Sequence, residues 1–408
     1  MNQNLKICMV AYACHPTGGG EHWLGWGWAE TAARLGSVWL VTPPKHEAEI
    51  RAAAEGINLT PVFVVLPKKF VKLSERLGSL GVWLRKFFWH EMARRVIRKL
   101  HAEESFSVIH QTTFHSFRVP FSGRGLGVPS VWGPVAGGES VPPGFENYLG
   151  KAAKEENHRR WINRATLILP WIRQSLSQST VIFVSNRTTR DFFPPCYRSK
   201  CRVVPPNAVR KEDLKPLSEN PKNLNPLILL YVGNCVERRG LPLLLEAMKG
   251  LNASQVTLVV AGAGSALAAW KKQANDLAIG DRVTFLGMIP MDEVRLWYDR
   301  ATVFVFPSLR DSGGSGLMEA MTRALPVVSL NWAGPAEMID ANCGVLVDVD
   351  SPQAAICGLR EAIIDLTTQP ARARELGLAA RNRAASEFTW EGKERILADV
   401  YSQITSPL

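Results

Sequence analysis

Short apolar runs and segments of helical periodicity alternate along most of the chain. The runs are rich in β-branched and aromatic residues, as is typical of buried strands. We expect strands within residues 6–12, 37–42, 60–67, 106–110, 128–141, 180–185, 227–232, 256–261, 283–286, 303–306 and 325–330. Apolar residues recur at helical spacing in 23–35, 151–178 and 239–250, and through most of the chain after residue 352. Because parallel strands need long crossovers, this alternation predicts an α/β fold with helix-covered parallel sheets.

The pattern is interrupted once by a polar stretch, residues 207–226, in which Pro and Asn recur. This stretch is the expected linker, because domain boundaries fall in such segments and the strand pattern restarts at Leu227. At 408 residues, the chain is also too long for one ordinary core. We therefore expect Rossmann-like domains at 1–206 and 227–390, with a cleft between them.

The segment 303–330 reads as strand, glycine loop, helix and strand, with glycines at 313, 314 and 316. Such a loop lets a ligand approach the backbone, and the helix start offers amide groups to a phosphate. Asp311 precedes the glycines and Glu319 lies in the first helical turns. Glu319 can accept two hydrogen bonds from a ribose diol. Alternatively, Glu319 only suits the helix dipole and Asp311 is an ordinary loop acid.

Asp311 to Glu319 resembles the acid-x7-acid signature of retaining glycosyltransferases of the GT-B fold, family 4, with Asp in place of the commoner first Glu. The resemblance implies that Glu319 holds the ribose of a nucleotide sugar and that Asp311 contacts the sugar. Backbone groups expected to help it are those of Ser312, Gly313, Gly314, Ser315, Gly316 and Leu317. The resemblance also implies that the first domain binds the acceptor, that the second binds the donor, and that 391–408 forms a helix crossing back to the first.

Positive charge for the donor diphosphate is expected in Gly233–Gly240, GNCVERRG, which resembles the family's GRxxxxKG. Arg239 takes the place of the family's Lys. Asn234 stands where the family has Arg, and Arg238 is the residue that can compensate. The donor site is further expected to include Gly262 and Gly264 of the sequence AGAGS, and Met288 and Ile289 in the base-binding loop.

Resemblance also extends to loops of the first domain. Gly18 to Glu21 follow the first strand and resemble the GGxE loop beneath the donor phosphates, which assigns Gly19 and Gly20 to the donor. A plain tight turn is the alternative. His110 ends a strand and matches the first histidine of a family HxH arrangement that contacts the donor sugar. Thr112 occupies the second place, so His115 from the same loop is an alternative.

The stretch 132–139, WGPVAGGE, resembles the WGPVGGGE of one subgroup of these transferases. It places Gly137, Gly138 and Glu139 near the acceptor or the donor sugar.

A net charge of +11 and a pI near 9.4 indicate an anionic partner: a nucleotide, a phospholipid surface or a nucleic acid. Residues 68–100 are strongly basic and contain interleaved aromatic residues. They predict either contact with an anionic membrane or a lipid-linked acceptor, or a helix whose aromatics pack on the sheet while its charges face water. A nucleic-acid partner is not expected, because no recognised binding module accompanies the charge.

No metal ion and no cofactor is expected, with the nucleotide diphosphate sugar acting as the donor substrate. The seven cysteines are scattered and contain no CxxC pair, so reduced thiols are predicted. Cys196 and Cys201 are not expected to bind a metal ion. The same holds for Asp348 and Asp350. The sequence lacks a long uncharged apolar run and a signal peptide, so we expect a cytoplasmic protein, with possible peripheral contact at the inner face of the membrane.

These expectations converge on a hexosyltransferase-type, metal-independent enzyme. It would move a sugar with retention, from a UDP-sugar by preference, to a glycan, lipid-linked or small-molecule acceptor, in the synthesis of cell-surface polysaccharide or glycoconjugate. Two alternatives stay open: a non-catalytic nucleotide-sugar-binding protein, favoured by Asn234 and Thr112, and a GT-B sugar-nucleotide epimerase.

Overall fold

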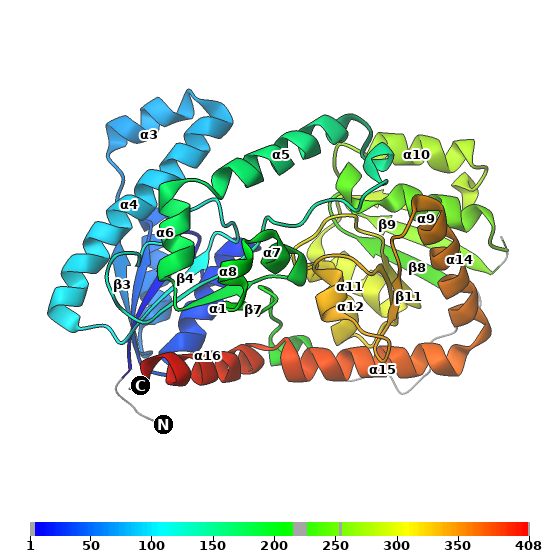
Figure 1. Cartoon of the computed structure of the whole chain (residues 1–408). Coiled ribbons are helices and arrows are strands. Elements are labelled where there is room, and N and C mark those ends of the chain that lie inside the picture. Colours follow the sequence, from blue (N-terminus) through cyan, green and yellow to red (C-terminus); the bar gives the residue numbers. More distant parts are fainter. Residues whose placement is uncertain (1–4, 215–226, 253–254, 407–408) are drawn as a thin grey trace. The chain divides into compact units, whose positions relative to one another are not determined.

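The computed structural model describes residues 5–214, 227–252 and 255–406, and these fall into two compact units (Figure 1). Unit 1 comprises Met1–Gly138, Trp161–Ala208 and Trp390–Leu408. Unit 2 comprises Glu139–Arg160 and Val209–Thr389. The sequence analysis assigns 139–160 to the first domain, whereas this segment packs with unit 2 because Val141, Phe145 and Leu149 enter its core. Most of the expected linker, residues 215–226, lies outside the described residues.

Unit 1 is built on a seven-stranded parallel sheet in the order β3-β2-β1-β4-β5-β6-β7. Its strands are β1 (Lys6–Ala11), β2 (Ser37–Thr42), β3 (Leu59–Phe63), β4 (Val108–Thr113), β5 (Ser130–Val135), β6 (Val181–Val184) and β7 (Cys201–Val203). Its helices are α1 (Glu21–Ala33), η1 (Pro44–His46), α2 (Glu47–Ala54), α3 (Lys68–Glu75), α4 (Gly78–Glu104), α6 (Pro170–Gln178), α7 (Arg187–Phe192), α8 (Pro195–Arg198) and α16 (Trp390–Thr405). Helix α5 (Ala153–Thr166) has residues in both units.

Both faces of this sheet are covered. Ile7 and Met9 of β1 pack in one apolar cluster with Trp28 of α1, whereas Cys8 and Val10 pack in another with Trp89 of α4. Successive side chains of a strand point to opposite faces, so a strand buried on both sides reads as the continuous apolar run seen in the sequence. The α/β class with parallel sheets is confirmed.

Unit 2 has a six-stranded parallel sheet in the order β10-β9-β8-β11-β12-β13. The strands are β8 (Leu227–Val232), β9 (Val256–Ala261), β10 (Val283–Gly287), β11 (Val303–Phe306), β12 (Val327–Leu330) and β13 (Val345–Val347). The helices are η2 (Glu146–Ala152), η3 (Lys211–Asp213), η4 (Glu237–Arg239), α9 (Leu241–Lys249), α10 (Leu267–Asp276), η5 (Gly280–Arg282), α11 (Met291–Arg300), α12 (Ser315–Thr322), α13 (Pro335–Met338), α14 (Pro352–Thr368) and α15 (Pro370–Glu387). The strand order reverses between β8 and β11. Open α/β sheets bind ligands at the carboxyl ends of the strands at such a reversal.

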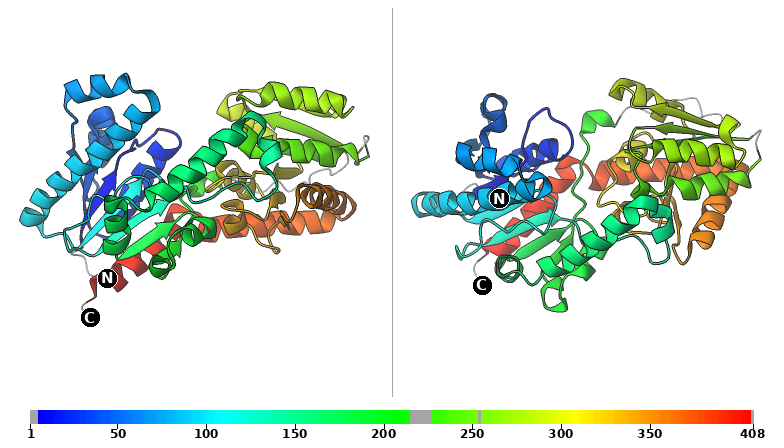
Figure 2. Two further views of the ribbon diagram at one scale, coloured as in Figure 1. Left: turned by 45° about the horizontal axis from the view of Figure 1, so that its top comes forward. Right: turned by 90° about the horizontal axis from the view of Figure 1, so that it is seen from above.

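The last helix, α16, packs on α1 in unit 1 (Figure 1 and Figure 2). Trp390 fits against Gly27, where an added Cβ would lie 2.0 Å from the indole ring. The ring also meets Trp28 edge-on at 5.9 Å between centroids. A glycine on α1 is therefore needed for the two helices to approach this closely.

The basic stretch at 68–100 forms two helices, α3 and α4, which contact each other. The interpretation in which aromatic side chains pack on the sheet holds for one of them. Trp89 is 1% exposed and its indole N–H donates to the carbonyl of Val64 at 2.9 Å, so it belongs to the core. Other apolar side chains are turned to solvent: Leu73, Leu77, Leu80, Val82 and Phe88. No helix in the described part of the chain is long and apolar enough to cross a membrane.

Candidate functional site

A pocket of about 220 Å³ opens in unit 2 at the carboxyl ends of β8, β9, β10 and β11. It therefore lies at the reversal of strand order. Its lining residues are Val232, Gly233, Asn234, Arg239, Ala261, Gly262, Met288, Ile289, Met291, Val294, Phe306, Gly314, Ser315, Gly316 and Glu319. The walls are mostly apolar, and a few polar groups converge on the space, as is typical of small-molecule sites.

The floor of the pocket includes the amino end of α12. Gly314 caps this helix in the left-handed conformation, with φ at 50°, and among the described residues it has no side-chain cap hydrogen bond. Glycine adopts this conformation at no steric cost, and helix-start amides carry partial positive charge. The residues of the first turn, Ser315 and Gly316, line the pocket. This end of α12 is therefore suited to an anion.

Asp311 organises the loop before that helix. Its Oδ1 accepts hydrogen bonds from the amides of Gly313 and Gly314, at 2.8 Å each, and its side chain is 9% exposed. Asp311, Ser312, Gly313 and the fully buried Leu317 do not line the pocket. Asp311 thus shapes the backbone that faces the pocket, in addition to any contact with a ligand.

Arg239 is the cation of the pocket. Its Nη1 pairs with the carboxylate of Asp311, and the guanidinium lies over the ring of Phe306 at 5.4 Å. The Nε is buried without a hydrogen-bond partner among the described residues. Burial lowers the pKa of Arg239 to about 10, with the charge of Arg238 adding to the effect, so the group is still charged at neutral pH. A buried, incompletely paired guanidinium favours an anionic ligand.

Glu319 lies one turn into α12 and faces the same space. Burial raises the pKa of its carboxyl, although Arg323 and a hydrogen bond with Tyr298 oppose the rise. The Tyr298 hydroxyl also lies 2.9 Å from the carbonyl of Gly316, so its one proton is shared between two acceptors. Tyr298 therefore fixes both the helix start and the carboxylate, which leaves Glu319 oriented as an acceptor.

Two glycine loops bring β8 and β9 close together beside the pocket. An added Cβ on Gly262 would lie 1.9 Å from the carbonyl oxygen of Gly233, so only glycine fits. Asn234 is exposed in the pocket. Gly264 and Arg238 do not line it. The guanidinium of Arg238 donates instead to the carbonyl of Arg310 at 2.9 Å, so it does not replace the missing arginine directly.

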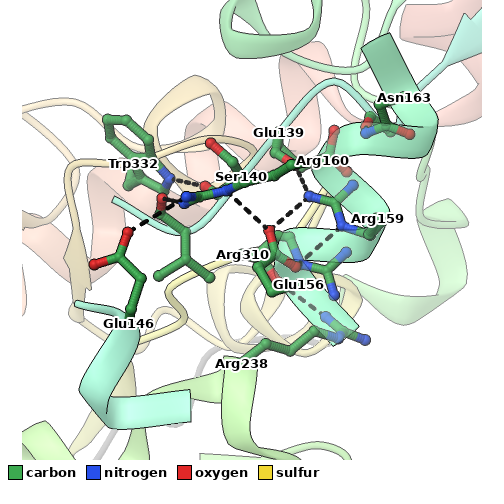
Figure 3. A network of polar contacts seen from close by, with 12 residues as sticks. Glu139, Ser140, Glu146, Glu156, Arg159, Arg160, Asn163, Arg238, Arg310 and Trp332 are labelled. Atoms are coloured by element: carbon green, nitrogen blue, oxygen red, sulfur yellow. Dashed lines mark hydrogen bonds and ion pairs between the residues drawn. The ribbon is translucent and has the colours of Figure 1, made fainter. Parts of the chain in front are cut away.

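A second polar cluster surrounds the buried carboxylate of Glu156 on α5 (Figure 3). Arg159 binds Glu156 with two nitrogens, Nε at 3.0 Å and Nη2 at 2.9 Å. Arg310 adds its Nε at 3.2 Å. Arg160 donates to the carbonyl of Val141 at 2.7 Å. Because Arg310 directly precedes Asp311, this cluster holds the segment 139–160 against the loop that forms the pocket.

Glu139 of the WGPVAGGE motif belongs to this cluster. Its carbonyl accepts from Arg159, and its charge acts on Arg238 and Arg310. Gly137 and Gly138 lie in unit 1. The carbonyl of Gly137 accepts from Asn163, while Gly138 packs against Phe192. The motif therefore divides between the two units.

His110 does not fit the substrate-contacting role that the resemblance implies. The side chain is 0% exposed, its Nδ1 lies 2.7 Å from the hydroxyl of Tyr401, and its Nε2 lies 2.8 Å from the carbonyl of Gly133. Burial lowers the pKa of His110 to about 4, so the ring is neutral. The physical reason is that His110 lies inside β4 (Val108–Thr113) rather than at its end, and that α16 brings Tyr401 against it. His110 is a hydrogen-bonded core residue.

His115 and the first glycine loop lie together in unit 1. The carboxylate of Glu21 accepts from the amide of His115 at 3.3 Å and pairs with its Nδ1 at 3.4 Å. Burial alone would raise the pKa of Glu21, but the hydrogen bonds and charge of His115, with the charge of Lys86, lower it overall. Gly19 and Gly20 precede this pair as an open loop, and Gly20 caps α1.

Sequence reasoning missed several residues of the site. Tyr298 and Phe306 read as ordinary core residues, because both are buried at strand or helix spacing. Glu156 and Arg159 lie within 151–178, for which the sequence predicted a helix but no part in the site. An acid followed three positions later by Arg is a signal for a helical ion pair, but not for burial.

The residues considered for metal binding are not clustered in the described part of the chain. Cys196 is exposed, Cys201 is partly buried, and neither belongs to a group of three ligands. Asp348 accepts a hydrogen bond from Asn331 at 2.9 Å and likewise belongs to no such group.

Comparison with known proteins shows where this chain has relatives. Residues 215–383 match the family model described as Glycosyl transferases group 1. The alpha-maltose-1-phosphate synthase of Mycolicibacterium smegmatis is 29% identical over 202 residues, which is 48% of this chain and 52% of that protein. The GDP-mannose-dependent alpha-(1-6)-phosphatidylinositol monomannoside mannosyltransferase of the same organism is 28% identical over 185 residues, 43% of this chain and 47% of that protein. The chain thus spans about half the length of the curated relatives it matches.

Solved structures match over nearly the whole chain. Sucrose-phosphate synthase from Thermosynechococcus elongatus has a TM-score of 0.62 at 20% identity, covering 98% of this chain and 99% of that one. HepE of Anabaena, solved in complex with UDP-glucose, has a TM-score of 0.62 at 14% identity, covering 98% and 100%. These likenesses show the fold. Residues 215–383 are therefore similar to the glycosyl transferases group 1 family, and the two parallel sheets of the chain have the GT-B fold.

Proposed function

We propose that this protein is a retaining, metal-independent glycosyltransferase of family 4 that uses a nucleotide diphosphate sugar, with a UDP-sugar favoured. One observation carries the proposal: an uncapped helix start, a buried arginine and an oriented carboxylate meet in one pocket at the strand-order reversal of unit 2. The helix start and the arginine suit the diphosphate of such a donor, and the carboxylate suits its ribose.

In this proposal each group has one task. The amides of Ser315 and Gly316 receive the diphosphate, Arg239 neutralises its charge, and Glu319 accepts from the ribose hydroxyls. The backbone at Met288 and Ile289 borders the base. Charge develops on the diphosphate as the bond to the sugar breaks, so Arg239 and the helix start stabilise the transition state more than the bound donor.

The identity of the donor base is inferred from two relatives and from the exposure of Met288. The structural neighbour HepE was solved with UDP-glucose, whereas one curated relative is GDP-mannose-dependent. We favour UDP because Met288 is 75% exposed and leaves the base region open, which suits main-chain contacts rather than a deep purine pocket. A panel of donors that contains both bases decides this point.

For the acceptor we propose a glycan, a lipid-linked glycan or a small molecule, in polysaccharide or glycoconjugate synthesis. Support for a surface-bound acceptor comes from α3 and α4. Leu73, Leu77 and Leu80 are 60%, 45% and 56% exposed beside the exposed cations Lys68, Lys69, Lys72 and Arg76. Exposed apolar side chains ringed by positive charge match the interface of an anionic bilayer.

A non-catalytic nucleotide-sugar-binding protein is the second candidate. It is favoured by the pairing of Arg239 with Asp311 and by Asn234, which brings no charge to the pocket. Both features reduce the positive charge available to a leaving diphosphate.

Slow donor hydrolysis separates the two candidates. The purified protein is incubated with UDP- and GDP-sugars and free nucleoside diphosphate is measured over hours. A transferase releases the nucleoside diphosphate. Arg239→Ala and Glu319→Ala should each reduce this release at least tenfold. Arg372→Ala, which removes a half-exposed arginine far along the chain on α15, serves as the control. Binding without release by the wild-type protein would favour the second candidate.

A further inference from the structure

Three histidines of unit 1 lie together where β1 and β2 end. His15 follows β1, His22 is in the first turn of α1, and His46 ends η1 after β2. The ring centroids of His15 and His46 are 4.3 Å apart, and those of His22 and His46 are 5.3 Å apart. Glu49, in the first turn of α2, adds a carboxylate. The carboxyl ends of adjacent parallel strands meet at one edge of the sheet, which is why these separate segments converge.

The spacing of these groups fits one metal ion. The ligand atoms of His15, His46 and Glu49 all lie within 4.8 Å of one another. Ligands at about 2.0–2.1 Å from a tetrahedral Zn²⁺ stand about 3.3 Å apart, so modest side-chain rotation closes the site. Imidazole nitrogens with a single carboxylate suit zinc and its transition-metal neighbours better than Mg²⁺ or Ca²⁺. We propose that His15, His46 and Glu49 bind a divalent transition-metal ion, with Zn²⁺ as the reference case.

His22 provides a second observation that points to a ligand. Its Nδ1 is buried and has no hydrogen-bond partner among the described residues. The ring also hydrogen-bonds the backbone of Cys14. One nitrogen held by backbone and the other free is the arrangement of a metal-ligating histidine. His22 lies outside the group of three ligand atoms, beside His46, and is the candidate for a fourth ligand and third nitrogen.

Charge around the site is mixed. Lys45 acts on His46 with a positive charge that opposes a cation, and the carboxylate of Glu49 acts in the other direction. Glu49 is exposed and free to rotate toward the histidines. The carboxylate is therefore the group on which the affinity of the site for a divalent ion should depend most strongly.

Metal binding would rearrange the loop after β1. The amide of Thr17 donates to Nδ1 of His15 at 3.1 Å. A metal on either nitrogen of His15 breaks this bond, because Nδ1 then carries the metal or the ring proton. The same loop leads into Gly18–Gly20 and Glu21. The metal would therefore fasten this glycine loop to η1 and α2.

The proposal is independent of the proposed glycosyl transfer, because every residue that lines the nucleotide pocket belongs to unit 2. It also differs from the sequence-based expectation of no metal. His46 and Glu49 are three positions apart at a helix start, which is the signal that the sequence offered for this site.

The test is metal binding by the full-length protein without a histidine tag. After chelation and dialysis, titration with ZnCl₂ is followed by calorimetry, and bound metal is counted by elemental analysis. We expect one ion per chain, a rise in melting temperature with Zn²⁺, and a tetrahedral visible spectrum with Co²⁺. His46→Ala and Glu49→Gln should each weaken binding about a hundredfold or more. His158→Ala removes an exposed histidine of α5 and should leave binding unchanged.

The outcomes are distinct. Loss of binding in both ligand variants but not in His158→Ala supports the site, and Glu49→Gln keeps the test valid if His46→Ala fails to fold, since Glu49 is exposed. Absence of stoichiometric binding in the wild-type protein overturns the proposal. Equal affinity in His46→Ala, Glu49→Gln and the control also overturns it, because the metal then binds elsewhere on the surface.

Discussion

The guanidinium of Arg239 is paired with the carboxylate of Asp311 inside unit 2. The two partners are 15% and 9% exposed, and the same carboxylate also holds the amides of Gly313 and Gly314. The cation of the pocket is therefore already neutralised by a neighbouring acid. In the proposed function a donor diphosphate competes with Asp311 for Arg239, and the cost of that exchange sets part of the donor affinity.

Asp311→Asn tests this competition. Asparagine keeps the Oδ1 acceptor for the loop amides but removes the charge, which frees Arg239 for a diphosphate. We expect UDP to bind about tenfold more tightly, which is about 1.4 kcal/mol. Calorimetry with UDP gives the affinity. Asp340→Asn, which breaks the more exposed pair with Arg383, is the control, and an unchanged affinity in Asp311→Asn would rule out the exchange.

Glu156→Gln should destabilise unit 2. Glu156 is 4% exposed and pairs with Arg159 and Arg310, so its loss removes the carboxylate that both guanidinium groups bind. We expect a loss of about 3 kcal/mol in the free energy of unfolding at neutral pH. Chemical denaturation measures it. The exposed neighbour Glu155→Gln should change the free energy of unfolding by less than about 0.5 kcal/mol.

The same variant predicts a pH dependence. Burial raises the pKa of Glu156, but its hydrogen bonds and ion pairs with Arg159 and Arg310 lower it overall. A lowered folded-state pKa contributes stability above the unfolded value of about 4.3, and that contribution is lost as pH falls through the folded value. The difference in unfolding free energy between wild type and Glu156→Gln should therefore shrink below pH of about 4. A difference that grew on acidification would contradict the assignment.

Leu80→Glu tests the proposed contact of α3 and α4 with an anionic membrane. Leu80 is 56% exposed, so the change should leave the fold intact but place a negative charge where an anionic bilayer would bind. We expect at least a tenfold loss in co-sedimentation with phosphatidylglycerol-containing vesicles. Ile364→Glu alters a similarly exposed apolar residue on α14, at 45%, and should have no effect. Equal binding by both variants would place any membrane contact elsewhere.

The raised pKa of Glu319 predicts how UDP binding changes with pH. Burial raises the pKa of this carboxyl, so it loses its acceptor character at a higher pH than an ordinary glutamate. UDP affinity should therefore fall between neutral pH and mildly acidic pH more steeply in the wild type than in Glu319→Gln. The phosphate of UDP titrates in both proteins, so the ratio of the two affinities isolates Glu319. A constant ratio would show that Glu319 does not meet the ribose.

Most of the fold could be predicted because strands buried on both faces leave continuous apolar runs. The expected strands 37–42, 227–232, 256–261 and 303–306 coincide with β2, β8, β9 and β11. The sequence predicted the ends of helices less well than it predicted the strands. The stretch 68–100 gave one basic periodic segment, whereas the chain bends before Gly78, whose φ of 52° breaks it into α3 and α4.

The site was predicted in part, for a physical reason. Glycines and acids near strand ends leave a local pattern, and Asn234, Arg239, Gly262, Gly314 and Glu319 do meet in one pocket. Pairings between distant segments leave no such local pattern in the sequence. The ion pair between Arg239 and Asp311 could not be predicted from their spacing in the sequence. The burial of His110 could not be predicted either, because Tyr401 comes from the far end of the chain.

The central claim is that the unit 2 pocket holds a nucleoside diphosphate by its phosphates and its ribose. Calorimetry of UDP and 2′,3′-dideoxyuridine diphosphate against wild type and Glu319→Ala tests it most directly, with the exposed Glu361→Ala as control. We predict that wild type binds UDP at least tenfold more tightly than the dideoxy analogue, and that Glu319→Ala binds both equally weakly. If Glu319→Ala and the wild type showed the same preference for UDP, or if the wild type bound neither nucleotide, the claim would be wrong.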